Sequence, residues 1–157
     1  MDVDRTDPHD LRRFVDAQAG AYAQAREELA AARKRSHWMW FVFPQMRGLG
    51  ASAMAHRYGI ASRAEAVAYL DHALLGPRLV DCTRLVLAAP PGTTATAILG
   101  SPDDVKLRSS MTLFDAVAAD SARFAGALRT STPFAAALDR FFAGRADPAT
   151  LRLLADR

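Results

Sequence analysis

The chain has 157 residues, of which 50% are hydrophobic and 24% charged, with a formal net charge of +3. This size and composition predict a folded globular protein and exclude a largely disordered one. No apolar run reaches the roughly 18–20 residues that a membrane helix needs, and the acidic, polar start is unlike a secretory signal. A single cysteine, Cys82, excludes an internal disulfide and a cysteine-based metal cluster. We therefore expect a cytoplasmic protein that does not bind membranes.

Signals for the start of a helix recur along the chain. Four times, a side chain that can cap a helix stands directly before a proline, which the first helical turn tolerates because its missing N–H has no partner there. These pairs are Asp7-Pro8, Ser101-Pro102, Thr132-Pro133 and Asp147-Pro148. Ser62 and Glu65 add the spacing of a reciprocal capping box. So many helix starts predict an all-α fold.

The predicted elements follow from apolar spacing and from breaks at proline and glycine. Phe14, Ala21 and Leu29 belong to a helical repeat that predicts a long first helix over 8–34. Residues 38–44 hold two tryptophans, a valine and two phenylalanines before a proline, and this composition favours a short extended segment. Further helices are expected at 51–58, 63–71, 77–88, 94–99, 102–118, 121–129, 133–143 and 148–155.

The domain organisation is expected to be simple. The sequence shows no repeat of fixed period, no low-complexity tract and no linker long enough to divide it. The later helices are too short to be stable alone, so the core must be shared among all of them. We therefore predict a single irregular multi-helix domain over residues 1–157, with an ordered core from about residue 8 to about residue 155.

The stretch KRSHWMWFVFPQMRGLG, residues 34–50, combines basic, polar and aromatic side chains. It lies in an interval between Glu28 and Glu65 that holds no carboxylate. The basic and histidine residues of this interval are Arg33, Lys34, Arg35, His37, Arg47, His56, Arg57 and Arg63. Such a local positive field favours an anionic ligand, and a solvated face in an arginine-rich chain is the alternative.

The two lysines of the chain, Lys34 and Lys106, stand out among 20 basic residues. A compact ammonium fits a narrow site as a point charge, which the larger guanidinium cannot do. On the helix predicted over 102–118, Lys106, Ser109 and Ser110 fall near one face and form a cluster of donors for phosphate or carboxylate oxygens. We expect a special role for at least one lysine, with chance placement as the alternative.

The aromatic side chains of the 34–50 stretch are candidates for stacking on a ligand. In an extended segment Trp38 and Trp40 would share a face, and one indole could stack on a nucleotide base while cations hold its phosphates. Phe43 and Gln45 would add to this wall. His37 could donate a proton, because its unperturbed pKa lies near neutrality. Burial of both faces, with a structural histidine beside them, is the alternative.

Several signatures of known chemistry are absent from the sequence. It contains no phosphate-binding loop, no dinucleotide fingerprint and no nucleophile elbow. His9, His56 and His72 lack metal-ligand spacing with one another or with acids, so we expect no metal site. We expect no cofactor either.

Five segments together resemble a known family over about residues 12–155. These are the 34–50 stretch, AMAHRYGI at 53–60, LGPRL at 75–79, ILGSPDDVKL at 98–107 and SSMTLF at 109–114. The family consists of small, mostly bacterial proteins and is known as a domain of unknown function. Its members have sometimes carried the name calpastatin, which nothing in this sequence supports. The resemblance implies an all-helical single domain and supplies no established reaction.

A looser similarity concerns residues 98–129. Their pattern of a basic helix, a Met–Leu–Phe patch and a short following helix is similar to that of helical proteins that act as N-glycosidases on metabolites of the ADP-ribose type. This similarity assigns no catalytic residue.

Three functions are consistent with these observations. The first is binding of an anionic small molecule of nucleotide or ADP-ribose type, with hydrolysis of its N-glycosidic bond as the reaction to test. The ligand-binding candidates are Lys34, His37, Trp38, Trp40, Phe43, Gln45, Lys106, Ser109 and Ser110. The catalytic candidates are His37, Asp103 and Lys106; Asp103 or Asp104 would orient water, and Lys106 would stabilise negative charge.

The other two functions need no small ligand. The chain could be a non-catalytic protein-interaction module, in which case the same aromatics would be core or a contact surface. It could instead bind nucleic acid through the arginines of residues 33–63, although the small net charge and the lack of a helix-turn-helix signature disfavour this. The oligomeric state is left open.

Overall fold

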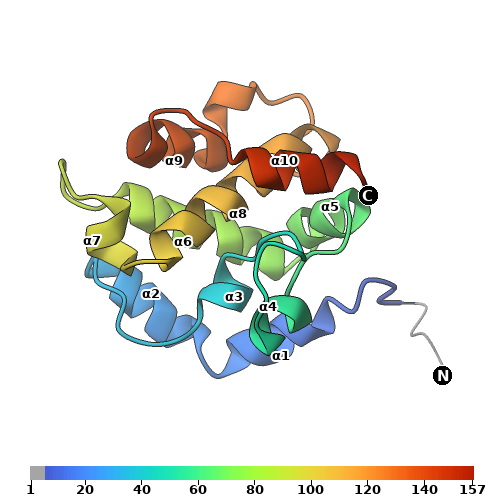
Figure 1. The fold of residues 1–157 in the computed structure, drawn as a ribbon, viewed down its shortest axis with the longest axis horizontal. Helices are drawn as coiled ribbons and strands as arrows, with labels where there is room; N and C mark the ends of the chain where they lie inside the picture. The colour runs from blue at the N-terminus through green and yellow to red at the C-terminus, as the bar shows by residue number, and fades with distance from the viewer. Residues whose placement is uncertain (1–5) are drawn as a thin grey trace.

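The structure, a computed structural model, describes residues 6–157, and it confirms the predicted all-α class. In Figure 1, α6 and α8 cross the middle of the molecule, α9 and α10 lie on one side, and α1, α2 and α4 lie on the other. The helices are α1 (Arg12–Ala19), α2 (Tyr22–Ala30), α3 (Met39–Val42), α4 (Ala53–Arg57), α5 (Arg63–Asp71), α6 (Leu75–Leu87), α7 (Ala95–Leu99), α8 (Asp103–Val117), α9 (Pro133–Phe142) and α10 (Pro148–Ala155). Within the described residues, β-pairing is limited to one isolated bridge between Met46 and Ile60.

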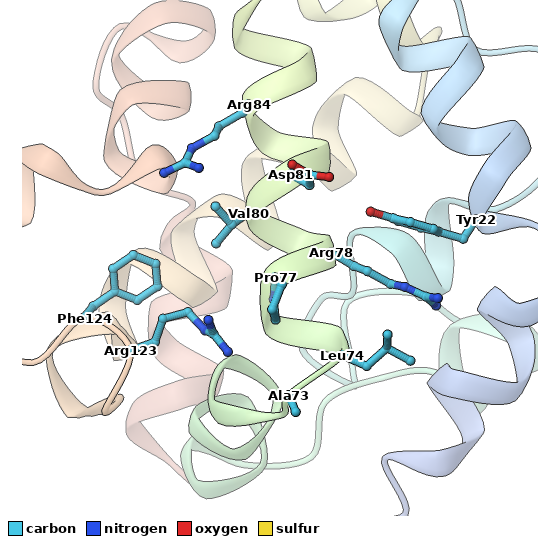
Figure 2. Close-up of a pocket in the computed structure, with 10 residues that line it drawn as sticks. All are labelled: Tyr22, Ala73, Leu74, Pro77, Arg78, Val80, Asp81, Arg84, Arg123 and Phe124. Atoms are coloured by element: carbon cyan, nitrogen blue, oxygen red, sulfur yellow. The ribbon is translucent and has the colours of Figure 1, made fainter.

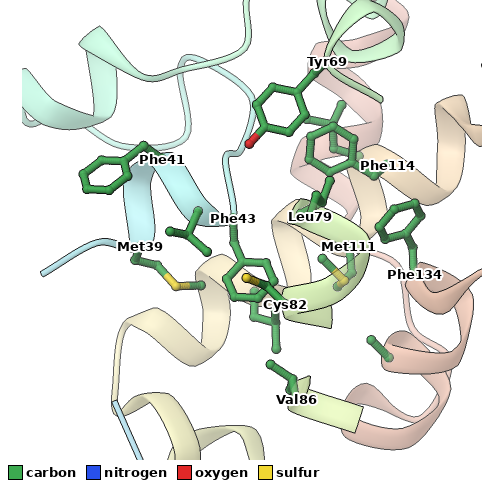
Figure 3. Packing of buried hydrophobic residues seen from close by; sticks show 14 of the residues in the cluster. Met39, Phe41, Phe43, Tyr69, Leu79, Cys82, Val86, Met111, Phe114 and Phe134 are labelled. Atoms are coloured by element: carbon green, nitrogen blue, oxygen red, sulfur yellow. The ribbon is translucent and has the colours of Figure 1, made fainter. Parts of the chain in front are cut away.

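The helix α8 is the centre of the core. It packs against α5, α7, α9 and α10, and most of its residues are buried. The Phe114 ring lies between those of Tyr69 and Phe134, with centroid distances of 5.4 and 5.9 Å (Figure 3). Cys82 of α6 belongs to the same core, and burial raises the pKa of its thiol to about 12. Cys82 is therefore a packing residue that stays protonated at neutral pH.

The prediction of one long helix over 8–34 is wrong, because the helix breaks at Gly20 and Ala21. Gly20 ends α1, and Ala21 leaves helical geometry with φ −131° before α2 begins. Glycine is the least favourable residue after proline in a helix interior, so this position interrupts the helix at low cost. The break lets α1 pack on α3 and α2 pack on α6. Phe14 and Leu29 are both buried, as the apolar spacing predicted.

The prediction of an extended segment over 38–44 is also wrong for its central residues. Residues Met39–Val42 form one helical turn, in which the carbonyl of Trp38 accepts hydrogen bonds from the amides of Phe41 and Val42. The β-preference of aromatic residues mostly reflects how they pack on a sheet, and no sheet is present among the described residues. Trp38 and Trp40 consequently do not share a face in the way that an extended segment would give.

Some of the predicted helix caps form in the structure and others do not. Ser62, Thr132 and Asp147 each accept a hydrogen bond from a backbone amide of the helix that follows, as predicted. Asp7 accepts from the amides of Leu11 and Arg12, but α1 starts only at Arg12. No side chain caps α8, so the cap predicted at Ser101 does not form.

The helix predicted over 121–129 does not form either. A 3-10 turn at Ala118–Asp120 and another at Arg129–Ser131 flank a series of turns. Gly126 adopts φ +80°, a left-handed conformation that only glycine reaches without strain and that no α-helix contains. The chain therefore crosses from α8 to α9 as an irregular loop, residues 121–132, which contributes Arg123 and Phe124 to a cleft described below.

Within residues 6–157, no helix is both long enough and apolar enough to cross a membrane. The same residues contain no cluster of three or more histidine, cysteine, aspartate or glutamate side chains placed to hold a metal ion.

Candidate functional site

The two lysines meet at one carboxylate, although 72 positions separate them in the chain (106 − 34). Lys34 Nζ lies 2.9 Å from Asp103 Oδ2, and Lys106 Nζ lies 3.5 Å from Asp103 Oδ1. Two segments are responsible: the loop after α2 carries Lys34, whose amide donates to the carbonyl of Ile98, and the first turn of α8 carries the other two residues. The structure thus brings three of the predicted site residues together.

Each lysine also lies over an indole. Lys34 Nζ is 5.1 Å from the ring centroid of Trp38, and Lys106 Nζ is 5.1 Å from that of Trp40, distances at which an ammonium is attracted to the ring face. We call Lys34, Trp38, Trp40, Asp103 and Lys106 the lysine–indole cluster. Its charges sum to +1, because Asp103 neutralises one of the two ammonium groups.

The two lysine–indole pairs of the cluster differ in how far their side chains are exposed to solvent. Lys34 is 8% exposed and also donates to the carbonyl of Ser36, while Trp38 is 1% exposed, so this half belongs to the packed interior. Lys106 is 25% exposed and Trp40 is half-buried. A ligand at the cluster would therefore meet Lys106 and Trp40, not Lys34 and Trp38.

A buried carboxylate that sequence reasoning missed holds this loop in place. Glu28 Oε1 accepts hydrogen bonds from the amides of Arg35 and Ser36 and from Trp38 Nε1, and Oε2 accepts from the Ser36 hydroxyl. Burial by itself would raise the pKa of Glu28, but these hydrogen bonds outweigh it and lower the pKa to about 2. Glu28 is therefore an ionised anchor for the loop segment that directly follows Lys34.

The other candidates lie apart from the lysine–indole cluster. His37 is exposed, and its imidazole makes no hydrogen bond to any residue in 6–157. Phe43 is buried in the core, 6.3 Å from Trp38 between ring centroids. Gln45 is half-buried, and its main-chain carbonyl accepts a hydrogen bond from the main-chain amide of Ile60. The roles assigned to these residues from the sequence remain predictions.

The two serines of α8 are buried and face away from solvent. Ser109 donates to Asp147 Oδ2, which also accepts from Thr150, so this hydroxyl supports the N-terminus of α10. Asp104 turns toward α7, where Oδ2 accepts from the Thr96 hydroxyl. Ser110 is fully buried, and its Oγ has no hydrogen-bond partner among the described residues.

Replacing Ser110 with alanine should raise the free energy of unfolding by about 1 kcal/mol, because an unpartnered buried hydroxyl loses its water without compensation. Urea denaturation of the purified protein measures this. Ser109→Ala is the matched control and should lower the free energy of unfolding by about 1 kcal/mol, since it removes a hydrogen bond. A loss of stability in Ser110→Ala as large as that in the control would show that Ser110 has a partner.

A cleft of about 610 Å³ runs along the exposed side of α6. Its residues are Tyr22, Ala73, Leu74, Pro77, Arg78, Val80, Asp81, Arg84, Arg123 and Phe124 (Figure 2). We call it the α6 cleft. Three arginines against one aspartate give its lining a charge of +2, and an aromatic ring lies at each end, Tyr22 from α2 and Phe124 from the 121–132 loop.

The three arginines of the α6 cleft differ in the contacts that they make with the rest of the protein. Arg78 stacks on the Tyr22 ring at 4.3 Å and donates to Gln18 Oε1. Arg123 donates through Nε to the carbonyl of Leu70, at the end of α5. Arg84 is exposed and makes no hydrogen bond or ion pair with residues 6–157. Two cations are thus pre-positioned by protein contacts, and the third is available to a ligand.

Tyr22 contributes a neutral hydroxyl to the α6 cleft. Burial is the main cause that raises the pKa of this phenol to about 12, and the nearby Cys82 and Asp81 add to the rise. Tyr22 therefore remains a hydrogen-bond donor over the physiological pH range. Asp81, on the same wall, lies 3.4 Å from Arg26 in an ion pair that is half-exposed.

Sequence reasoning missed the α6 cleft, although the LGPRL segment at 75–79, noted only for the family resemblance, contributes to it. This segment places Gly76 where a Cβ would come within 2.2 Å of the Leu70 carbonyl, so the start of α6 packs on the end of α5 and holds Arg78 at the cleft. No charge run marks the cleft, because Arg84 and Arg123 come from distant positions. The other cavities include one beside Arg13, Arg47 and Arg57, of about 510 Å³.

Comparisons with known proteins agree with the resemblance seen in the sequence. Residues 8–154 match a family model described as "Protein of unknown function (DUF1810)". The chain is similar to a conserved hypothetical protein, Rv1873 from Mycobacterium tuberculosis, whose crystal structure was solved at 1.38 Å. The two are 52% identical with a TM-score of 0.85, over 95% of this chain and 99% of that one. No curated protein matches the chain. The chain therefore belongs to the DUF1810 family, whose function is unknown.

Proposed function

We propose that this protein binds an anionic small molecule of nucleotide or ADP-ribose type, and that the α6 cleft is the place where it binds. The observation that carries this is the lining of the cleft, three arginines and two aromatic rings around about 610 Å³. Pockets for small ligands usually measure about 300–1,000 Å³. The volume, the positive charge and the aromatic ends all suit a ligand that joins phosphates to a ring.

Each part of such a ligand has a partner in the cleft. Arg84 has no protein partner within residues 6–157 and would bind a phosphate with two parallel hydrogen bonds. Arg78 is already stacked on Tyr22, so its position costs little entropy when an anion arrives. The half-buried ring of Phe124 offers a face for a base.

The lysine–indole cluster is the second location for the same ligand. Lys106 lies over the half-buried ring of Trp40, which gives a cation and an aromatic face side by side. Asp103 holds both lysines, however, so an anion arriving there would meet a carboxylate as well. The α6 cleft is the stronger of the two because its concavity is defined and its net charge is higher.

Hydrolysis of an N-glycosidic bond is the reaction to test first. Cleavage of such a bond builds positive charge on the sugar ring, and a carboxylate beside the ring stabilises that charge or orients the attacking water. Asp81 is the carboxylate that lines the α6 cleft, and Asp103 is the one in the lysine–indole cluster. Incubation with ADP-ribose and nicotinamide nucleotides, followed by chromatography, tests for released base or ribose.

Titration calorimetry with AMP, ADP and ADP-ribose tests the binding. We expect at least one of them to bind, and Arg84→Met to weaken it about tenfold, the effect of losing one charge-assisted contact. Lys106→Met should leave the affinity unchanged. Arg12→Met is the control, since Arg12 pairs with Asp16 on the exposed surface and lines neither site.

The variants also separate the alternatives. If Lys106→Met weakens binding and Arg84→Met does not, the ligand occupies the lysine–indole cluster. If none of the anions binds the folded protein, the proposal fails and a protein-interaction module becomes the better reading. The most exposed large hydrophobic residues, Met54, Val105, Leu128 and Leu151, lie on four separate segments, so they do not favour that reading now.

A further inference from the structure

The cavity of about 510 Å³ lies where the chain before α1 meets α4 and the start of α5. In Figure 1, α1 and α4 lie next to each other at this end of the molecule. The charged residues that line the cavity are Asp10, Arg13, Arg47, Arg57 and Glu65. We call it the arginine pocket. It shares no lining residue with the α6 cleft, so the two are separate sites.

Arg13 holds the arginine pocket together and has no donor left for a ligand. A guanidinium carries five N–H groups, and that of Arg13 makes five hydrogen bonds. One goes to Glu65 Oε2, two go to main-chain carbonyls before α1, and two go to the carbonyls of Arg57 and Gly59. Because Arg13 and Glu65 also neutralise each other, the charges open to a ligand are those of the other three residues.

The guanidinium groups of Arg47 and Arg57 keep accessible donors. Arg47 Nε donates to the carbonyl of His56, but its two terminal nitrogens make no hydrogen bond to residues 6–157. Neither of these nitrogens is a buried atom without a partner, so solvent reaches both. Arg57 is exposed, and its guanidinium lies 5.6 Å from the Tyr58 ring centroid without a hydrogen bond to residues 6–157. Two such groups suit the oxygens of a phosphate.

The main chain brings these two arginines to one cavity. A Cβ at Gly59 would come within 2.7 Å of Arg47 Cα, so only glycine allows the two segments to approach this closely. The Arg47 amide also donates to the carbonyl of Ile60, at 2.9 Å. Arg47 is therefore fixed against residues 59–60, two positions beyond Arg57. A ligand that binds both arginines meets a main chain that is already in place.

The remaining polar groups of the arginine pocket suit hydroxyl groups. Asp10 is exposed, and its carboxylate has no hydrogen-bond partner within residues 6–157, so it can accept. The Ser62 oxygen accepts from the Glu65 amide, while its O–H donates to no residue in the same range. No phenylalanine, tyrosine or tryptophan lines the pocket, so a nucleotide base would have no such ring to stack on. A sugar supplies hydroxyl groups that both donate and accept.

We propose that the arginine pocket binds a sugar phosphate. The phosphate accepts hydrogen bonds from Arg47 and Arg57, and a sugar hydroxyl donates to Asp10. The volume of about 510 Å³ lies within the usual range for small ligands. Asp10 repels a bare phosphate held close to it but accepts a hydroxyl, so it favours the phosphorylated sugar over the inorganic ion. This site is independent of the anion site proposed for the α6 cleft.

Titration of the full-length, ¹⁵N-labelled protein with glucose 6-phosphate and with ribose 5-phosphate, followed by amide NMR spectra, tests the proposal. We expect at least one of them to bind with a dissociation constant of about 1 mM or lower, with shifts centred on residues 9–13, 47 and 57–65. Inorganic phosphate and glucose are the comparison probes. Each lacks one half of the match, and both should bind at least tenfold more weakly.

Two arginine variants separate the arginine pocket from the surface around it. Arg57→Met should weaken binding about tenfold, because it removes a charge-assisted contact, and its main-chain carbonyl still accepts from Arg13. Arg63→Met is the matched control. It makes the same change of charge at an exposed side chain that pairs with Asp120 and does not line the pocket, so binding should stay within about twofold.

Asp10→Asn tests the preference for a sugar. Asn tolerates the left-handed backbone of this position, where φ is +50°, and it removes the repulsion of a bare phosphate. The preference for the sugar phosphate over inorganic phosphate should fall from about tenfold to about threefold or less. The proposal is overturned if neither sugar phosphate shifts the residues named above, if Arg63→Met weakens binding as much as Arg57→Met, or if Arg84→Met weakens it and Arg57→Met does not.

Discussion

Replacing Arg13 with methionine should lower the free energy of unfolding by about 3–5 kcal/mol, the cost of breaking a buried ion pair by removing one partner. Arg13 Nη2 lies 2.9 Å from Glu65 Oε2, and the two side chains are only 9% and 6% exposed. Methionine fills much of the same volume but leaves the Glu65 carboxylate buried without its cation.

The ion pair is only part of what Arg13 does. Its guanidinium also donates to four backbone carbonyls, those of His9, Asp10, Arg57 and Gly59. These contacts join the first turns of the chain to the segment between α4 and α5. Because four carbonyls and a carboxylate lose their donor together, we expect this substitution to have the largest effect of those discussed.

Urea denaturation followed by circular dichroism measures the change. The neighbouring Arg12→Met is the control: Arg12 pairs with Asp16 on the exposed surface, and this variant should stay within about 0.5 kcal/mol of the wild type. The double variant Arg13→Met with Glu65→Leu should recover part of the loss, because it removes the stranded charge. If Arg13→Met and Arg12→Met were equally stable, the buried pair would contribute nothing.

Replacing Glu28 with alanine should lower the free energy of unfolding by about 3 kcal/mol at pH 7. The substitution strands Trp38 Nε1 and the amides of Arg35 and Ser36, all of which now donate to this carboxylate. Each buried donor left without an acceptor costs about 1–3 kcal/mol. Glu28→Gln keeps an acceptor oxygen and loses only the charge, so its loss should be smaller than that of Glu28→Ala.

The effect of Glu28 should depend on pH in a defined direction. The pKa of Glu28 is about 2 in the folded protein, against 4.5 for a glutamate in the unfolded chain. Because the folded pKa is lowered, the unfolded chain binds the proton first as the pH falls. The stabilisation by Glu28 is therefore complete above about pH 4.5 and is lost as the pH falls from there toward about 2.

Urea denaturation of the wild type and of Glu28→Gln, at intervals from pH 7 to pH 3, tests this pH dependence. The difference between the wild type and Glu28→Gln should be constant above about pH 5 and shrink below it, since a protonated Glu28 resembles glutamine. The comparison cancels the titration of the other carboxylates. A difference that stays the same down to pH 3 would mean that Glu28 is not the ionised anchor of the loop.

Local chemistry in the sequence determined much of the fold. The caps at Ser62, Thr132 and Asp147 and the apolar spacing of Phe14 and Leu29 depend on interactions within a few residues, so the all-α class could be predicted from them. The scarcity of lysine singled out two positions that do meet in space. Both ammonium groups lie next to Asp103, while the special role expected for a lysine stays a prediction.

Only the tertiary structure decided the rest. Residues 39–42 are helical because burial overrode their β-preference, and the first helix divides at Gly20 because α1 and α2 pack on different neighbours. The α6 cleft combines Tyr22, Arg84 and Arg123, which come from three separate segments of the chain. Local sequence patterns describe residues a few positions apart, whereas a cavity is defined by distant segments and by what they leave unfilled.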